Sequence, residues 1–267
     1  MQPATTQSNY SLRDEIKSYW SLRAETFDSH PGHEIFSEPE RAAWHALIRR
    51  HLGNGDGRKA LDLASGTGVV SHLLDDLGFS VTGLDWAEPM LERARAKASA
   101  RGRTIRFFMG DAENTLEPDA SYDAITNRHL VWTLVDPEAA FREWHRLLKP
   151  AGCLLIVDGD FVNPSMLSRM ANRIAERVRR LGFGAIEVQN GPAPAQMETH
   201  RSILSRVYFS GGARAEAVAE LLTRAGFSSV TIDTNMRAIH RAQKKHFGFL
   251  KGLERATQHR YAILAIK

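Results

Sequence analysis

One stretch of this chain, residues 59–70, constrains the fold more than any other, because it reads as a short apolar strand, a glycine turn and the start of a helix. Gly66 and Gly68 supply a turn where backbone can approach a ligand closely. Seventeen residues beyond Gly68, a second apolar strand ends at Asp85. In a doubly wound sheet an acid at that place faces the ribose hydroxyls of a bound nucleoside, because ligands sit beyond the carboxyl ends of the strands. The pattern predicts an α/β fold with a nucleoside-type cofactor site.

The hydrophobic pattern around this stretch alternates between strands and helices. Strands are predicted at 59–64, 80–84, 104–108, 122–127, 153–158, 228–234 and 260–266, and helices at 11–27, 39–52, 68–77, 88–100, 137–148 and 212–226. Strands that alternate with helices favour a parallel sheet with right-handed crossovers. The predicted fold class is therefore α/β, with a doubly wound, mostly parallel, seven-stranded sheet and N-terminal helices.

The motifs indicate which nucleoside cofactor is bound. An NAD fingerprint places Gly or Ala three residues after the second glycine, where this chain has Ser71. Residues 61–68 and 83–91 together resemble the class I S-adenosylmethionine (SAM)-dependent methyltransferases. Three further stretches, 110–113, 121–125 and 147–152, are similar to that family's adenine-side loop, fourth strand and turn before the fifth strand. The resemblance implies a Rossmann-like sheet whose last strand is antiparallel, SAM as cofactor and S-adenosylhomocysteine as product.

The resemblance also implies roles for individual residues. Asp85 is expected to accept hydrogen bonds from both ribose hydroxyls, with Trp86 over the adenine. Asp111 is expected to meet the adenine amino group, and Asp62 the loop amides or the cofactor ammonium. Members of the family usually carry glycine where this chain has Ala64, whose methyl group is expected to narrow the space beside the methionine part of the cofactor. The full predicted cofactor set is Tyr19, Arg23, Asp62, Ala64, Ser65, Gly66, Gly68, Asp85, Trp86, Met90, Asp111, Ala112, Asn127 and Arg128.

Two segments are candidates for the acceptor side of the site. In residues 19–28, Tyr19 is predicted to face the sulfonium and Arg23 to hold the cofactor carboxylate; the alternative is an ordinary amphipathic helix packed on the sheet. Residues 127–132, after the fourth strand, lie where the acceptor approaches the methyl group. His129 is the predicted general base because histidine titrates near neutrality, and the alternative is a histidine that hydrogen-bonds structure or cofactor backbone. The predicted catalytic residues are His129 and Tyr19.

Composition excludes several other classes. The chain has 267 residues, 43% hydrophobic and 25% charged, with a formal charge of +4, which is typical of a soluble globular protein. No run approaches membrane-spanning length and residues 1–9 lack an apolar signal core, so a cytoplasmic protein is expected. The basic stretches 169–180 and 237–260 are predicted to form solvent-exposed faces rather than a nucleic-acid-binding surface. His30 and His33 flank a Pro-Gly turn without a ligand cluster, so no metal is expected.

Residues 160–208 do not fit the alternation of strands and helices, and they are predicted to be an insertion over the carboxyl edge of the sheet. The predicted organisation is an N-terminal helical lid at 1–35 and a SAM-binding α/β domain at 36–267, with an inserted helical lid at about 160–208. The predicted function is SAM-dependent methyl transfer to O, N or S of a small molecule. Two alternatives stay open: a SAM-dependent enzyme that catalyses cyclisation or aminocarboxypropyl transfer, and a non-catalytic SAM sensor. The expected partner is a small-molecule substrate, with neither nucleic acid nor membrane, while the acceptor and the oligomeric state are not specified by the sequence.

Overall fold

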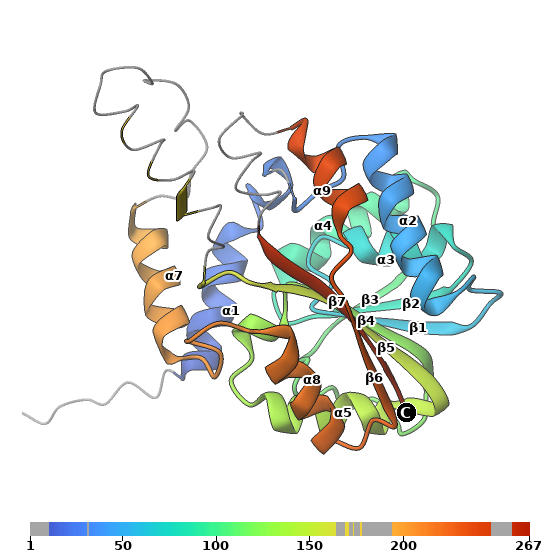
Figure 1. Ribbon diagram of the computed structural model, residues 1–267. Coiled ribbons are helices and arrows are strands. Elements are labelled where there is room, and N and C mark those ends of the chain that lie inside the picture. The colour runs from blue at the N-terminus through green and yellow to red at the C-terminus, as the bar shows by residue number, and fades with distance from the viewer. Residues whose placement is uncertain are drawn as a thin grey trace, which may run out of the picture.

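A single seven-stranded sheet forms the centre of the structure (Figure 1). The computed structural model describes residues 11–30, 32–163, 169, 170, 173, 177, 194–246 and 258–267. The strands are β1 (Lys59–Leu63), β2 (Ser80–Asp85), β3 (Arg106–Met109), β4 (Tyr122–Arg128), β5 (Leu148–Asp160), β6 (Ser229–Asp233) and β7 (His259–Ile266). Their order is β3-β2-β1-β4-β5-β7-β6, and β7 runs antiparallel between β5 and β6 while the other pairs are parallel. The predicted fold class is confirmed.

Helices cover both faces of the sheet. The described helices are α1 (Leu12–Arg23), α2 (Glu38–Leu52), α3 (Val69–Asp76), α4 (Glu88–Ala100), α5 (Pro137–Leu147), α7 (Pro194–Arg206), α8 (Ala215–Arg224) and α9 (Arg237–Lys244), with 3-10 turns at Phe27–Ser29 and Val131–Thr133. α2, α3, α4 and α9 lie on one face, and α5 and α8 on the other (Figure 1). Along β1, Ala60 packs into the α2/α3 cluster and Leu61 into the α5/α8 cluster. The strand is thus buried on both faces, as in parallel sheets generally.

The observed element bounds differ from the predicted ones at two instructive places. The first predicted helix, 11–27, ends at Arg23, and a separate 3-10 turn follows at Phe27–Ser29. Of the predicted turn at 147–152, residues 148–152 are instead part of β5, which already pairs with β4 at Leu148 and resumes pairing at Cys153 after a register shift. A bulge in the pairing absorbs the extra residues, so the strand continues where a turn was expected.

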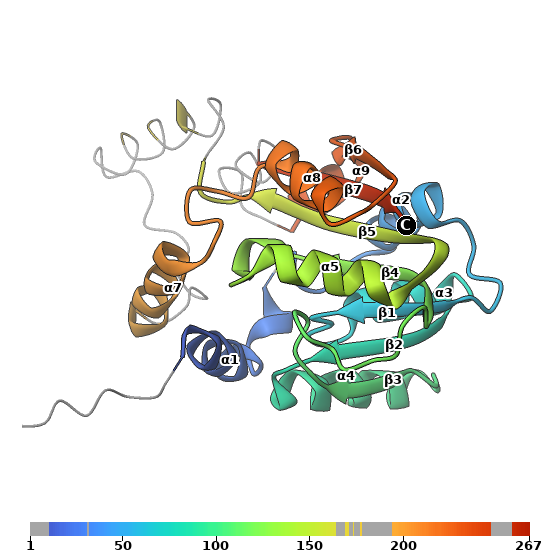
Figure 2. The same ribbon diagram turned by 90° about the horizontal axis from the view of Figure 1, so that it is seen from below.

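α1 and α7 lie side by side at the carboxyl end of the parallel strands (Figure 2). Ile16 and Tyr19 of α1 pack against Ile203 of α7 and Val207 just after it, forming a small buried cluster apart from the main cores. A capping box at Ser11 begins α1. The two helices therefore form a wall over the edge of the sheet where ligands are expected.

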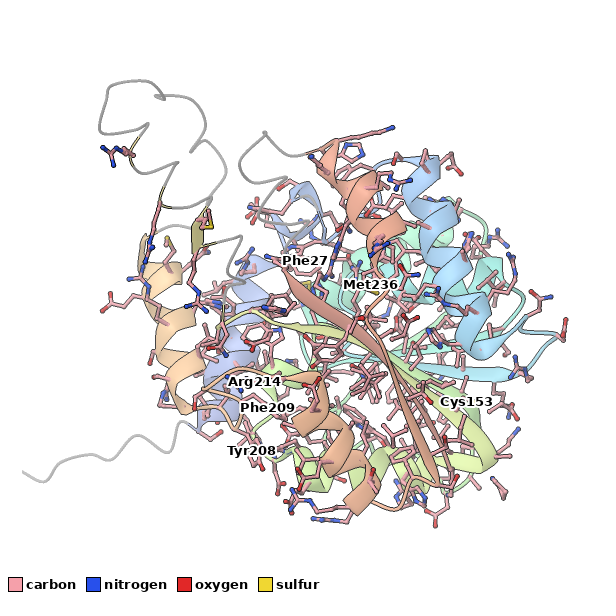
Figure 3. All side chains as sticks on the ribbon, in the orientation of Figure 1. Phe27, Cys153, Tyr208, Phe209, Arg214 and Met236 are labelled. Carbon is pink, nitrogen blue, oxygen red and sulfur yellow. The ribbon has the colours of Figure 1, made fainter. Side chains whose placement is uncertain are left out.

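The segment between α7 and α8 returns the chain to the sheet: Phe209 is buried in the core on the α5/α8 face, whereas Tyr208 is exposed (Figure 3). Residues 164–168, 171, 172, 174–176 and 178–193 lie outside the described residues, so the predicted lid insertion is described only in part. The division of the chain into a lid at 1–35 and a domain at 36–267 stays a prediction. Within the described ranges, no helix has the length and apolar character that crossing a membrane requires.

Candidate active site

A cavity of about 340 Å³ opens at the carboxyl ends of β1 to β4. Its floor is made by the ends of β1, β2 and β4 and by the loop after β3, and α1 and α7 close its outer side. A volume of this size falls in the range of small-molecule sites. The cavity lining contains all of the predicted cofactor and catalytic residues except Gly68 and Asn127.

The glycine turn after β1 runs through left-handed backbone at several residues. Ala64 has φ of 50°, Gly66 of 55° and Gly68 of 82°. A side chain in this conformation costs about 1–2 kcal/mol, which is why glycine was expected at the Ala64 position. Gly68 does not line the cavity; a Cβ on it would lie 3.1 Å from Phe107 Cζ and 3.2 Å from Ala94 Cβ. Gly68 therefore lets the turn at the start of α3 pack closely against β3 and α4, and its role toward the cofactor stays a prediction.

Asp85 is buried at the end of β2 and organises the turns on both sides of it. Its Oδ2 accepts a hydrogen bond from the Gly66 amide at 2.8 Å, and its Oδ1 accepts one from the Ala87 amide at 2.8 Å. Burial raises the pKa of Asp85 to about 6, against the opposing effect of these two amides. Each carboxylate oxygen can accept a further bond, so the geometry fits two ribose hydroxyls.

The adenine-side loop is tied to α1 by an arginine that the sequence analysis missed. Arg13 Nη1 lies 2.8 Å from Asp111 Oδ2, and its Nη2 lies 2.6 Å from Glu113 Oε2. Asp111 Oδ1 also accepts a bond from the Glu113 amide at 2.8 Å, and Glu113 Oε1 one from the Val135 amide at 2.8 Å. Burial raises the pKa of Glu113. The predicted adenine contact is thus braced by α1 and by the loop after β4.

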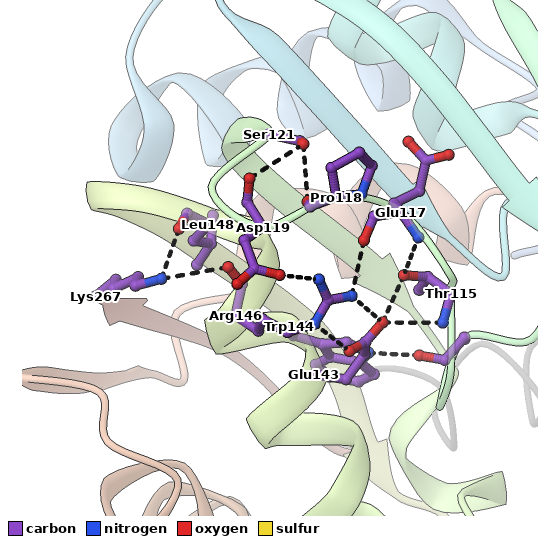
Figure 4. Close-up of polar contacts among 11 residues, drawn as sticks. Thr115, Glu117, Pro118, Asp119, Ser121, Glu143, Trp144, Arg146, Leu148 and Lys267 are labelled. Carbon is purple, nitrogen blue, oxygen red and sulfur yellow. Dashed lines mark hydrogen bonds and ion pairs between the residues drawn. The ribbon is translucent and has the colours of Figure 1, made fainter.

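The same loop is fastened to α5 further on (Figure 4). Glu143 accepts hydrogen bonds from the Thr115 amide at 3.0 Å and the Thr115 hydroxyl at 2.6 Å, and from Arg146 Nε at 2.8 Å. Trp144 Nε1 donates to the Ala112 carbonyl at 2.7 Å. Burial alone would raise the pKa of Glu143, but the bonds from Arg146 and Thr115 outweigh it and lower that pKa. These contacts attach the loop after β3 to α5.

We expect Arg13→Gln to weaken SAM binding by about three- to tenfold. Arg13 is 37% exposed, and a partly solvated ion pair contributes on the order of 1 kcal/mol or less, with two partners here. Titration calorimetry measures the change. Arg142→Gln is the matched control, because Arg142 is 62% exposed and pairs only loosely with Glu138 at 3.9 Å. Equal affinities in the two variants would contradict the bracing role of Arg13.

Asp62 and Arg128 form the inner wall of the cavity. Asp62 accepts hydrogen bonds from Ser71 Oγ at 2.6 Å and Thr126 Oγ1 at 3.3 Å, and burial raises its pKa to about 7. Arg128 donates from Nη2 to the His33 carbonyl at 2.6 Å, and burial lowers its pKa. The two side chains attract each other electrostatically. Opposite charges thus line the part of the cavity where a zwitterionic amino-acid tail is predicted.

Several buried polar atoms have no hydrogen-bond partner among the described residues. They include Arg23 Nε, Ser65 Oγ and Arg128 Nη1, all of which line the cavity. Arg23 is 9% exposed, and its Nη1 donates a hydrogen bond to the Tyr19 hydroxyl at 3.0 Å. Buried donors without a protein partner indicate that a ligand accepts their hydrogen bonds, and the carboxylate of the predicted cofactor tail is a suitable acceptor. Asn127 has an unpartnered amide as well but lies outside the lining, so its cofactor role stays a prediction.

The outer wall of the cavity is aromatic. Trp20 and Trp132 lie edge to face with centroids 6.2 Å apart, and Phe161 lies 6.5 Å from Trp132. The imidazole of His200, on α7, lies 5.6 Å from the Tyr19 ring and 5.4 Å from Trp132. Of these residues only Tyr19 belongs to the predicted site. Trp20 and Trp132 lie in the two predicted acceptor-side segments, and Phe161 and His200 lie in the predicted insertion at 160–208, but none of the four was predicted individually as a site residue.

His129 lies at the predicted position, at the end of β4, in left-handed backbone with φ of 60°. Its amide donates to the Val157 carbonyl at 3.0 Å, and its Nε2 contacts the Arg260 guanidinium. Because a guanidinium only donates, Nε2 is the acceptor in this contact. A nitrogen already engaged in this way is poorly suited to take a proton from an acceptor, and the general-base role of His129 stays a prediction.

His33 belongs to the cavity as a packing residue. Its ring stacks on Phe27 with centroids 4.2 Å apart, its Nδ1 lies 3.2 Å from the Phe27 carbonyl, and burial lowers its pKa to about 3. His30 Nδ1 contacts the Thr26 carbonyl at 2.8 Å. In the described part of the chain no three His, Cys, Asp or Glu side chains are grouped to hold a metal ion.

The fold and the cavity together define an α/β protein with a nucleoside-cofactor site at the carboxyl ends of its strands. Residues 61–156 match the family model of a methyltransferase domain. A demethylmenaquinone methyltransferase of Thermus thermophilus is 40% identical over 103 residues, which is 38% of this chain and 47% of that protein. Residues 61–156 are therefore a SAM-dependent methyltransferase domain, and its cofactor is SAM.

Other relatives cover more of the chain. A demethylmenaquinone methyltransferase of Paenarthrobacter aurescens is 29% identical over 239 residues, 86% of this chain and 87% of that protein. A ubiquinone/menaquinone biosynthesis C-methyltransferase of Bdellovibrio bacteriovorus is 27% identical over 174 residues, 64% of this chain and 73% of that protein. A phosphoethanolamine N-methyltransferase of Haemonchus contortus, solved with S-adenosylhomocysteine, has a TM-score of 0.62 at 15% identity and covers 96% of this chain and 60% of its own. That last likeness concerns the fold.

Proposed function

We propose that this protein transfers the methyl group of SAM to a ring carbon of a small, hydroxylated aromatic acceptor of the quinol type. Prediction from the sequence specified oxygen, nitrogen or sulfur as the acceptor atom. The names of the relatives support carbon instead, since they describe demethylmenaquinone and ubiquinone/menaquinone C-methyltransferases. Methyl transfer to a small molecule is common to both descriptions.

The observation that carries the proposal is the chemistry of the cavity wall. The carboxylates that line the cavity, within the described residues, belong to β1, β2 and the loop after β3, on the cofactor side: Asp62, Asp85, Asp111 and Glu113. The outer wall offers Trp20, Trp132 and Phe161, with Arg23 in the same region. Aromatic faces suit a planar ring. Within the described residues no carboxylate lines the outer wall to pair with a cationic amine, so a neutral or anionic acceptor is favoured.

Carbon methylation suits such an acceptor. When bound, SAM supplies an electrophilic methyl group, and the protein's task is to align a nucleophilic carbon with it. A ring hydroxyl that loses its proton places negative charge on the neighbouring ring carbon and makes that carbon nucleophilic. The site therefore needs a planar slot and a group that receives a proton from the hydroxyl.

Incubation with methyl-labelled SAM and 1,4-dihydroxynaphthalene, kept reduced with ascorbate, tests the proposal. We expect the product to carry the label on a ring carbon, as shown by mass spectrometry and carbon NMR, with S-adenosylhomocysteine formed in equal amount. A label on oxygen, or no labelled product, would contradict the ring-carbon assignment. Methylthioadenosine in place of S-adenosylhomocysteine would instead support the sulfonium reactions left open by the sequence.

A further inference from the structure

His200 is the one titratable side chain that α7 contributes to the cavity wall. α7 is held against α1 by Ile203 and Val207, which share a buried cluster with α1, and by an ion pair of 2.6 Å between Arg206 and Glu15. The histidine therefore comes from a helix with two independent attachments. Its position is set by packing, not by a free loop.

The imidazole of His200 sits between two aromatic rings. It lies 5.6 Å from Tyr19 at a tilt of 31°, and 5.4 Å from Trp132 at 65°. Nδ1 is enclosed and has no hydrogen-bond partner among the described residues. A polar ring fixed in an aromatic wall without a protein partner leaves hydrogen-bonding capacity for a ligand.

The charge state of His200 suits a proton acceptor. Burial, and secondly the nearby guanidinium of Arg23, lower the pKa of His200 below its usual 6.5. The ring is therefore neutral at neutral pH and holds one unprotonated nitrogen. His129 differs, because its Nε2 already contacts Arg260.

From this geometry we infer that His200 binds the ring hydroxyl of the acceptor and receives its proton when the ring is methylated. The inference rests on the proposed function. The O–H bond breaks, the proton moves to His200, and the electron pair stays on oxygen and is delocalised onto the ring carbon. That carbon bonds to the methyl group as the carbon–sulfur pair leaves with sulfur. The ring carbon's hydrogen then departs to water as a proton, and His200 returns its proton to the oxygen.

The first test needs no turnover. In the presence of S-adenosylhomocysteine, calorimetry compares 1-naphthol with 1-methoxynaphthalene, which lacks the hydroxyl proton. We expect the wild-type protein to bind naphthol about five-fold more tightly, the scale of one net hydrogen bond. His200→Phe keeps an aromatic ring between Tyr19 and Trp132 and is expected to bring the ratio near one. A ratio that persists in His200→Phe would overturn the binding role.

The second test separates proton transfer from positioning. On 1,4-dihydroxynaphthalene, His200→Asn is expected to lower kcat by about 10²- to 10³-fold while KM changes by less than about threefold, because the amide holds the hydroxyl but takes no proton. Ser205→Ala, on the exposed side of the same helix, is the control and is expected to leave kcat unchanged. An unaltered kcat in His200→Asn would overturn the base role.

The two tests also separate this inference from the proposed function. If the wild-type protein forms no ring-methylated product, the proposed function is refuted. If its preference for naphthol nevertheless disappears in His200→Phe, recognition of the hydroxyl by His200 is retained. A wild-type protein that forms the product, with kcat and the binding ratio unaffected by either substitution, would refute only the role of His200.

Discussion

Asp85→Ala is expected to weaken SAM binding by about 3 kcal/mol, or roughly 150-fold, the upper range for hydrogen bonds to a charged group. The loss has two sources. Two ribose hydroxyls lose their predicted acceptor, and the amides of Gly66 and Ala87, each 2.8 Å from the carboxylate, lose the group that sets the turns. Titration calorimetry with SAM and with S-adenosylhomocysteine measures the change. Both ligands share the ribose, so both should weaken equally.

Glu92→Ala is the control for this substitution, since it removes an exposed acid from the helix that follows Asp85. The dependence on pH provides a second readout. Because the pKa of Asp85 is raised to about 6, the carboxyl gains a proton as the pH falls through 6 and loses acceptor capacity. SAM affinity of the wild-type protein should therefore decrease below pH 6, and Asp85→Asn should lack that part of the decrease. If Asp85→Ala bound SAM with wild-type affinity, Asp85 would have no role in binding the cofactor.

The sequence predicted the sheet and most of the residues that line the cavity at the ends of β1 and β2, because both depend on local order along the chain. Strand, glycine turn and helix follow one another within residues 59–76, and Asp85 ends the next strand. A parallel sheet brings such strand ends to one edge, so the positions of residues in sequence specify their neighbours in space. Gly68 shows the limit of this reasoning, since its contacts with Phe107 and Ala94 depend on helix packing.

Individual contacts between segments distant in sequence were not predicted, on either side of the cavity. Arg13 meets Asp111 across 98 positions of sequence, and nothing in the helical pattern of α1 indicates that partner. His200 reaches Tyr19 and Trp132 only because α7 packs on α1. An amphipathic pattern shows that a helix has a buried face but does not identify what covers it. The aromatic wall therefore required the structure.

Trp144→Ala is expected to destabilise the fold by about 3–5 kcal/mol, the scale for removing a large aromatic side chain from a core. Trp144 is fully buried on α5, its ring lies 5.1 Å from that of Phe141, and its Nε1 donates to the Ala112 carbonyl at 2.7 Å (Figure 4). Urea denaturation measures the free energy of unfolding. Arg142→Ala, on the exposed face of the same helix, is the control and should change it by less than about 0.5 kcal/mol.

Trp144→Phe separates the two contributions of this side chain. Phenylalanine keeps most of the buried ring but leaves the Ala112 carbonyl without its donor, which costs about 1–3 kcal/mol. Ala112 belongs to the adenine-side loop, so this variant should also bind SAM several-fold more weakly while remaining folded. A variant that is destabilised by this amount but binds SAM like the wild type would show that the loop keeps its position without the Trp144 hydrogen bond. In that case the bonds from Thr115 to Glu143 of α5, and Arg13 from α1, would be left as its supports.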